Sequence, residues 1–200
     1  MIPTPRPAPT TMVSFRDGSL EAAIDTVLNV IAEDRDPHPV LPRRLDGLFR
    51  RLKDAATSDE VQSTQDLIWA VWCDHPEKAA RDAMHEGIAS MAEEDFDTAL
   101  SIFDALVIAE PEWSEAWNKR ATVAFILKHE RECLADLARV LRREPRHFGA
   151  LSGFGQIALR NGFVPEAIVA FETVLRINPH LAGVRRVLED VRRARPTALN

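Results

Sequence analysis

The stretch AFETVLRINP, residues 170–179, decides the fold, because two earlier stretches repeat its pattern. IFDALVIAEP at 102–111 and LADLARVLRREP at 134–145 carry apolar residues at helical spacing and also end in proline. The three prolines are separated by two equal intervals of 34 residues. Proline stops a helix because it has no amide hydrogen and clashes with the preceding turn. The fixed period predicts an array of similar helical units.

Aligning the chain on these prolines brings small and large apolar residues into register at three further positions. They are Gly87, Ala121 and Gly155; Ala99, Cys133 and Ala167; and Phe103, Leu137 and Phe171. This pattern resembles the tetratricopeptide repeat (TPR), in which small residues let two helices cross closely and a large apolar residue fills the space beside them. The resemblance implies an all-α fold, a right-handed superhelical α-solenoid of antiparallel helix pairs, with units at 80–113, 114–147 and 148–181. Residues 45–195 also resemble small bacterial TPR proteins to which no function is assigned.

The segments on either side of the three units carry helical patterns of their own. Residues 182–196 predict a C-terminal capping helix, with apolar residues on one face and arginines on the other. Residues 45–79 predict a degenerate repeat or an N-terminal cap. Residues 19–35 predict an amphipathic helix, which a linker at 36–44 follows and a disordered proline-rich tail at 1–18 precedes.

The composition predicts a cytoplasmic protein. The N-terminus lacks the continuous apolar core of a secretory signal, and no later window reaches the length of a membrane span. The two cysteines, Cys73 and Cys133, lie far apart in the sequence and suit a reducing compartment. Tyrosine is absent, which weakens the case for a surface that stacks nucleic-acid bases.

Charge is distributed unevenly along the chain. Residues 1–111 hold 10 basic and 21 acidic side chains, whereas residues 112–200 hold 15 basic and 10 acidic ones. This asymmetry favours association of the C-terminal half with an acidic partner. Nucleic-acid binding through the arginine-rich end, VRRVLEDVRRARP, is a weaker alternative, because Glu189 and Asp190 interrupt the basic run. We therefore expect no nucleic-acid partner.

No pattern of catalytic or metal-binding residues emerges from the sequence. Cys73 and His75 form a C-x-H pair, but two further ligands at a suitable spacing are missing. The acidic run EEDFD at 93–97 falls in the predicted turn of the first unit, where a solvated helix cap explains it. HERE at 129–132 does not have the spacing of a metalloprotease motif. We expect no enzymatic activity, no cofactor and no metal site.

The resemblance implies that one face of each unit's first helix lines a concave groove. The candidate binding residues on that face are Arg81, His85, Asn118, Lys119, Thr122, Phe125, Gly149, Gly153, Gln156 and Arg160. This set combines apolar, amide and basic groups, which suits a peptide or protein with acidic or carboxylate features. The predicted function is a non-enzymatic protein–protein interaction module, an adaptor or scaffold. The carboxylate clamp of some family members is not expected, because Met84 and Ile88 stand where it needs lysine and asparagine.

Two features leave alternatives open. The amphipathic helix at 19–35 needs a surface on which to bury its apolar face, and that surface could be the groove itself. The chain would then be a structural or self-associating component, and its oligomeric state stays open. The second feature is the pair Gly149 and Gly153, which the repeat does not require. They predict that a partner peptide or the chain's own N-terminal helix comes close to the backbone there.

Overall fold

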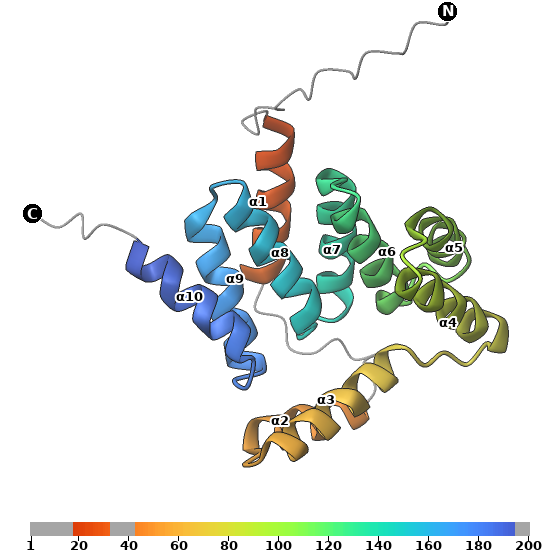
Figure 1. Ribbon diagram of the computed structural model, residues 1–200, viewed down its shortest axis with the longest axis horizontal. Coiled ribbons are helices and arrows are strands. Elements are labelled where there is room, and N and C mark those ends of the chain that lie inside the picture. The colour runs from red at the N-terminus through yellow and green to blue at the C-terminus, as the bar shows by residue number, and fades with distance from the viewer. Residues whose placement is uncertain (1–17, 33–42, 195–200) are drawn as a thin grey trace, which may run out of the picture.

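All regular structure in the described part of the protein is α-helical, which confirms the predicted fold class. The computed structural model describes residues 18–32 and 43–194 (Figure 1). Its helices are α1 Gly18–Ala32, α2 Arg43–Asp54, α3 Ser58–Trp72, α4 Lys78–Ala92, α5 Phe96–Ala109, α6 Ser114–Ile126, α7 Glu130–Arg143, α8 Phe148–Arg160, α9 Val164–Ile177 and α10 Ala182–Ala194. Most of the predicted tail at 1–18 and linker at 36–44 lies outside the described residues.

Three antiparallel helix pairs form the body of the protein. They are α4 with α5, α6 with α7 and α8 with α9, and α10 packs on α9 at the C-terminal end. We call the side formed by the first helices, α4, α6 and α8, the inner face, and the side formed by α5, α7 and α9 the outer face. Among the helices of residues 18–32 and 43–194, none combines the length and apolar character that crossing a membrane requires.

Each pair turns between its two helices through one residue with a positive φ. Glu94, Lys128 and Gly162 have φ angles of 61°, 63° and 81° and stand one repeat apart. The amide of the next residue then donates to a carbonyl of the first helix, over distances of 2.8 to 2.9 Å. This bond uses a carbonyl that the end of the helix leaves unpaired. The left-handed turn is therefore a feature of every repeat, although only the third pair has glycine at the turn position.

Glycine sets the distance between crossing helices in the first and third pairs. A Cβ atom at Gly87 would stand 2.6 Å from the ring of Phe103, and one at Gly155 would stand 2.5 Å from the ring of Phe171. Both rings are buried. The repeat pattern thus identified a close approach in which an aromatic ring lies directly on a glycine backbone.

The substitution Gly155→Ala is expected to lower the free energy of unfolding by about 1–3 kcal/mol, because Phe171 has no room to move in a packed core. Chemical denaturation of the full chain measures this change. Gly47→Ala is the matched control, since no atom lies within 4 Å of its Cβ position. That exposed helical site is expected to gain about 0.5–1 kcal/mol instead. Equal effects at the two sites would contradict the packing at Gly155.

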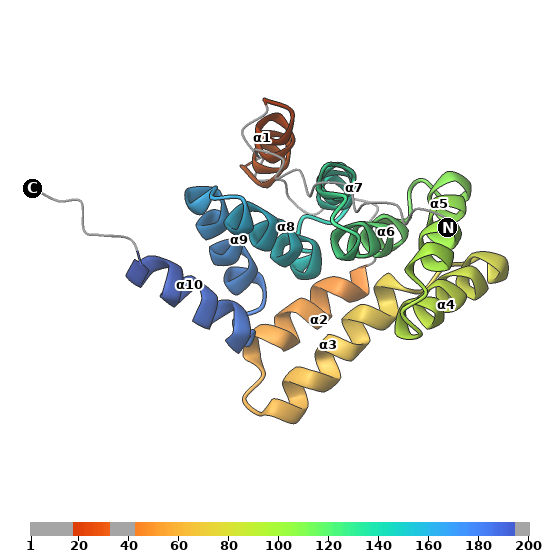
Figure 2. The same ribbon diagram turned by 45° about the horizontal axis from the view of Figure 1, so that its top comes forward.

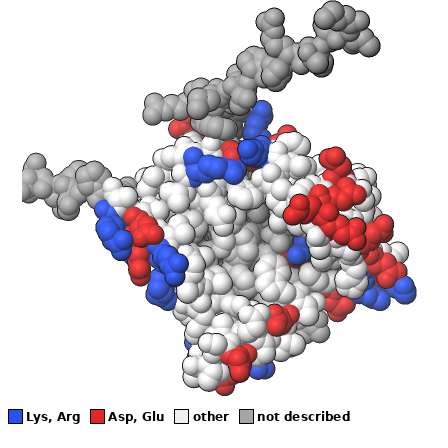
Figure 3. All heavy atoms as spheres, viewed as in Figure 1, with Lys and Arg blue, Asp and Glu red and all other residues white. Residues whose placement is uncertain are grey.

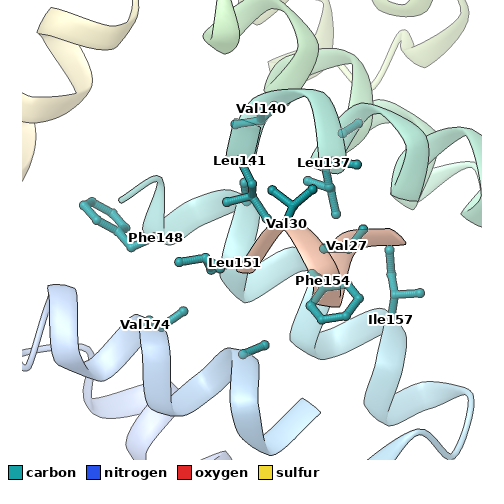
Figure 4. Packing of buried hydrophobic residues seen from close by; sticks show 14 of the residues in the cluster. Val27, Val30, Leu137, Val140, Leu141, Phe148, Leu151, Phe154, Ile157 and Val174 are labelled. Carbon is teal, nitrogen blue, oxygen red and sulfur yellow. The ribbon is translucent and has the colours of Figure 1, made fainter. Parts of the chain in front are cut away.

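The N-terminal helix α1 packs on the outer face, against α7 and α9. Its buried side chains, Leu20, Ile24, Val27 and Val30, form one stripe at helical spacing. Val27 and Val30 point into the cluster that contains Leu137 of α7 (Figure 4). The alternative in which this helix fills the concave groove is therefore wrong, because its apolar stripe is buried on the second helices of the second and third pairs.

Helices α2 and α3 form a hairpin on the opposite side from α1. Figure 2 shows α6 and α8 between α1 and this hairpin. A capping box starts α3, since Thr57 accepts the Glu60 amide at 3.2 Å and the Glu60 carboxylate accepts the Thr57 amide at 3.1 Å. Leu45, Leu52 and Ile68 are fully buried. The chain upstream of the repeats thus covers the second and third pairs on both faces.

Candidate partner-binding surface

The inner face carries few charges in its middle. Figure 3 looks onto this side of the molecule, and the acidic and basic side chains gather mainly at its margins. The hairpin of α2 and α3 lies along one edge of this face, below α8 in the view of Figure 1. The geometry of that contact decides which part of the face a partner can reach.

Two tryptophan rings of α3 dock on the start of α8. The ring of Trp72 stacks on the imidazole of His147 with centroids 4.0 Å apart, and it lies 5.1 Å from the ring of Phe148. The ring of Trp69 meets both edge-on, at 5.5 and 5.6 Å. A Cβ atom at Gly149 would stand 2.8 Å from Cη2 of Trp69. Gly149 therefore leaves the space that the Trp69 ring fills.

Polar contacts hold the edges of the hairpin. Arg146 donates to Asp46 at 2.6 Å, and its guanidinium lies 4.6 Å from the ring centroid of Phe49. His180 donates through Nε2 to the carbonyl of Leu52 at 2.8 Å. The Trp113 indole donates to the Trp72 carbonyl at 2.8 Å. These bonds connect the hairpin to the segments that lead into α6, α8 and α10.

A buried polar network lies beneath the tryptophans. His147 accepts the Ala150 amide at Nδ1, which caps α8 and leaves the ring proton on Nε2. Nε2 then donates to Glu115 at 2.8 Å. Glu115 also accepts from Asn118 and from the Lys119 ammonium, each at 3.2 Å. Glu115 and His147 are both 0% exposed, so they satisfy each other in the protein interior.

The same network sets the protonation state of Glu115. Burial by itself raises the pKa of this carboxyl group, but its interactions with His147, and less strongly with Lys119 and Asn118, lower the pKa below its ordinary value. Glu115 is therefore a carboxylate at neutral pH. We call Glu115, Asn118, Lys119, His147, Phe148 and Gly149 the covered floor.

A cleft remains open between the hairpin and the first pair. Its volume is about 750 Å³, and it is lined by Gly47, Leu48, Arg51, Leu67, Ala70, Val71, Cys73, Asp74, Arg81 and His85. The apolar residues come from α2 and α3, and Leu67 is 45% exposed. Arg81 donates to the carbonyls of His75 and Pro76, and these bonds hold its guanidinium at the N-terminal end of α4. The cleft thus combines an apolar wall with basic side chains.

The comparisons with known proteins agree with this architecture. The tetratricopeptide repeat model matches residues 131–182. A TPR repeat-containing protein of Rhizobium etli is 34% identical over 151 residues, which cover 76% of this chain and 74% of that protein. The chain belongs to the TPR family.

A solved TPR structure confirms the helical solenoid. The first TPR of Spaghetti (RPAP3), bound to the HSP90 peptide SRMEEVD, matches with a TM-score of 0.55 at 20% identity. The match covers 57% of this chain and 91% of that one, and at this identity it shows a common fold. The TPR fold supports a protein–protein interaction module in general.

Three of the candidate residues of the TPR groove lie under the hairpin. Asn118 is 6% exposed and bonds to Glu115. The Lys119 ammonium pairs with Glu115 and lies 5.3 Å from the ring centroid of Trp69. Gly149 contacts Trp69 as described above. The close approach predicted at Gly149 is therefore made by α3, and the helix at 19–35 has no part in it.

The other seven candidates divide between the cleft and the rest of the inner face. Arg81 and His85 line the cleft. Thr122 and Gln156 are exposed, and Phe125 and Gly153 are half-buried. Arg160 pairs with Glu130 and lies 4.7 Å from the ring centroid of Phe125. A Cβ atom at Gly153 would meet Leu137 at an ordinary 3.8 Å, so nothing in the structure requires glycine there.

Sequence reasoning missed the residues that cover the TPR groove. It treated His147 as isolated, although Glu115 is the second residue and His147 the last residue of one unit, and a repeat of this length brings those two positions together. Trp69 and Trp72, three residues apart at the end of a predicted helix, were a second signal. The sequence did not show that these tryptophans contact the start of α8, because no local pattern links α3 to a helix so far away along the chain.

The described residues offer little reactive chemistry. No group of three or more histidine, cysteine or acidic side chains within 18–32 and 43–194 could hold a metal ion. Burial raises the pKa of the Cys73 thiol to about 11 and that of Cys133 to about 12. Both cysteines are therefore protonated at neutral pH and are weak nucleophiles.

Proposed function

We propose that this protein is a non-enzymatic interaction module that binds a peptide segment of a partner protein in the cleft between the hairpin and α4. The observation that carries the proposal is the cleft itself, whose apolar wall contains Leu48, Leu67 and Val71. Largely apolar pockets of this size bury the apolar side chains of a ligand, and a few polar groups in the pocket fix the orientation of that ligand.

The charges around the cleft favour a partner segment that bears a carboxylate. The lining contains three basic residues, Arg51, Arg81 and His85, and one acidic residue, Asp74. By contrast, Lys119 and Arg160 already pair with Glu115 and Glu130, so they offer less to an acidic partner. An apolar side chain next to a carboxylate suits the cleft better than the remainder of the inner face.

The substitution Leu67→Asp is expected to reduce partner capture by about tenfold or more, because it places a charge where an apolar contact forms. The measurement is photo-crosslinking in a cell extract, with a benzophenone amino acid in place of Ala70 in the full chain. Val169→Asp is the matched control, since Val169 on α9 is 43% exposed, close to the 45% of Leu67. Crosslinks that persist equally in both variants would exclude the cleft.

A further inference from the structure

Helix α3 contacts the covered floor in the way that a bound helical ligand contacts its binding site. Trp69 and Trp72 stand three residues apart, so their rings leave the same side of one helix. The rings meet three consecutive residues of the array, His147, Phe148 and Gly149. The glycine backbone, the stacked imidazole and the phenylalanine ring together form an apolar surface that accommodates two aromatic side chains.

The floor keeps its own hydrogen bonds when the hairpin is removed. Glu115 takes its donors from Asn118, Lys119 and His147, all of which belong to the array. The Trp72 indole nitrogen is buried and has no hydrogen-bond partner. Departure of the rings therefore breaks no bond within the floor, and it gives that buried N–H group access to water.

Arg146 and His180 bond to the hairpin at its edges, whereas the bond from the Trp113 indole to the Trp72 carbonyl is buried. Arg146 and Asp46 form one of the edge bonds, and the Asp46 side chain is 46% exposed. Lys119 adds a cation close to the face of Trp69, an arrangement that attracts any aromatic ring in that place. The floor thus selects aromatic rings at a helical spacing and makes no polar bond to the tryptophan side chains.

We propose that the covered floor is a binding site for an amphipathic helix that presents two aromatic rings three residues apart. The hairpin occupies this site in cis, and a partner helix of that kind displaces it. This inference goes beyond the proposed function, because it concerns the floor beneath the hairpin and not the cleft beside it. Because the hairpin supplies the apolar wall of the cleft, a helix that displaces it also removes the cleft, so the two binding modes exclude each other. Leu67→Asp tests the cleft, and Gly149→Ala tests the floor.

The test supplies α3 in trans as a fluorescently labelled peptide of residues 58–72. Its binding to the full chain is followed by fluorescence anisotropy. A Trp69→Ala/Trp72→Ala variant leaves the floor vacant, and it is expected to bind the peptide about tenfold or more tightly than the wild type, whose floor is occupied. Adding Gly149→Ala to this variant should abolish binding, because the new Cβ occupies the space that the Trp69 ring of the peptide would fill. Adding Gly153→Ala instead should leave binding unchanged.

A second measurement uses the wild-type chain, which does not depend on the folding of any variant. Excess unlabelled peptide should raise deuterium uptake by residues 43–57 of the protein, a part of the hairpin that the peptide lacks. Peptide carrying alanine at both tryptophan positions should have no effect. The proposal is overturned if the vacated variant binds no better than the wild type, or if the peptide leaves uptake in 43–57 unchanged.

Discussion

The substitution His147→Ala is expected to lower the free energy of unfolding by about 3–5 kcal/mol, because it truncates a fully buried ring and removes a hydrogen bond to a charged group. Three losses coincide at this position. Glu115 loses its donor at 2.8 Å while it stays fully buried. The Ala150 amide loses its cap, and Trp72 loses the ring stacked 4.0 Å away. Chemical denaturation followed by circular dichroism measures the total.

A double-mutant cycle isolates the contribution of the hydrogen bond between His147 and Glu115. Glu115→Gln removes the carboxylate to which His147 donates, so the two changes together should cost less than the sum of the single changes. His129→Ala is the matched control, because His129 also precedes a helix but is exposed and caps no amide with its side chain. It is expected to change stability by about 0.5 kcal/mol or less. Additive effects of Glu115→Gln and His147→Ala would contradict the pair.

The substitution Gly149→Ala is expected to loosen the hairpin. Its Cβ would stand 2.8 Å from the Trp69 ring, which cannot move away without losing contact with Trp72 at 5.0 Å and with Phe148. A steric conflict of this kind costs about 1–3 kcal/mol, which corresponds to roughly tenfold or more in the opening equilibrium. Hydrogen exchange measured by mass spectrometry should show faster uptake in residues 43–72.

The matched control for this prediction lies one helical turn away. Gly153→Ala adds the same methyl group to α8, where the nearest atom is 3.8 Å away. It should leave exchange in the hairpin unchanged and stabilise α8 by about 0.5–1 kcal/mol. Faster exchange in the hairpin with both variants would indicate a general effect of alanine in α8 and would count against the contact with Trp69.

The sequence predicts the repeated part of this fold because the repeat is local. Each pair satisfies its main interactions within about 34 residues, so the glycine and the aromatic residue that cross appear at a fixed spacing. The close approach between Gly155 and Phe171 follows from that spacing. The spacing also explains why the turn residues Glu94, Lys128 and Gly162 recur.

The parts upstream of the repeats could not be placed from sequence. The apolar stripe of α1 shows that this helix is buried, but the inner and outer faces both offer apolar surfaces. Likewise, Gly149 indicated a close approach without identifying what approaches. The answer depends on Trp69, which lies 80 residues earlier and has no pattern in common with α8. Contacts of this kind are fixed by tertiary packing alone.

The contact between α3 and α8 is the centre of this account, and nuclear Overhauser spectroscopy of the isotope-labelled full-length protein tests it most directly. Cη2 of Trp69 lies 2.8 Å from the ideal Cβ position of Gly149, so the ring proton at this carbon should give strong cross-peaks to the α-protons of Gly149. Cross-peaks between Phe171 and Gly155 serve as the internal reference. A spectrum that shows the reference peaks but none between the rings of Trp69 or Trp72 and residues 147–149 would contradict the account.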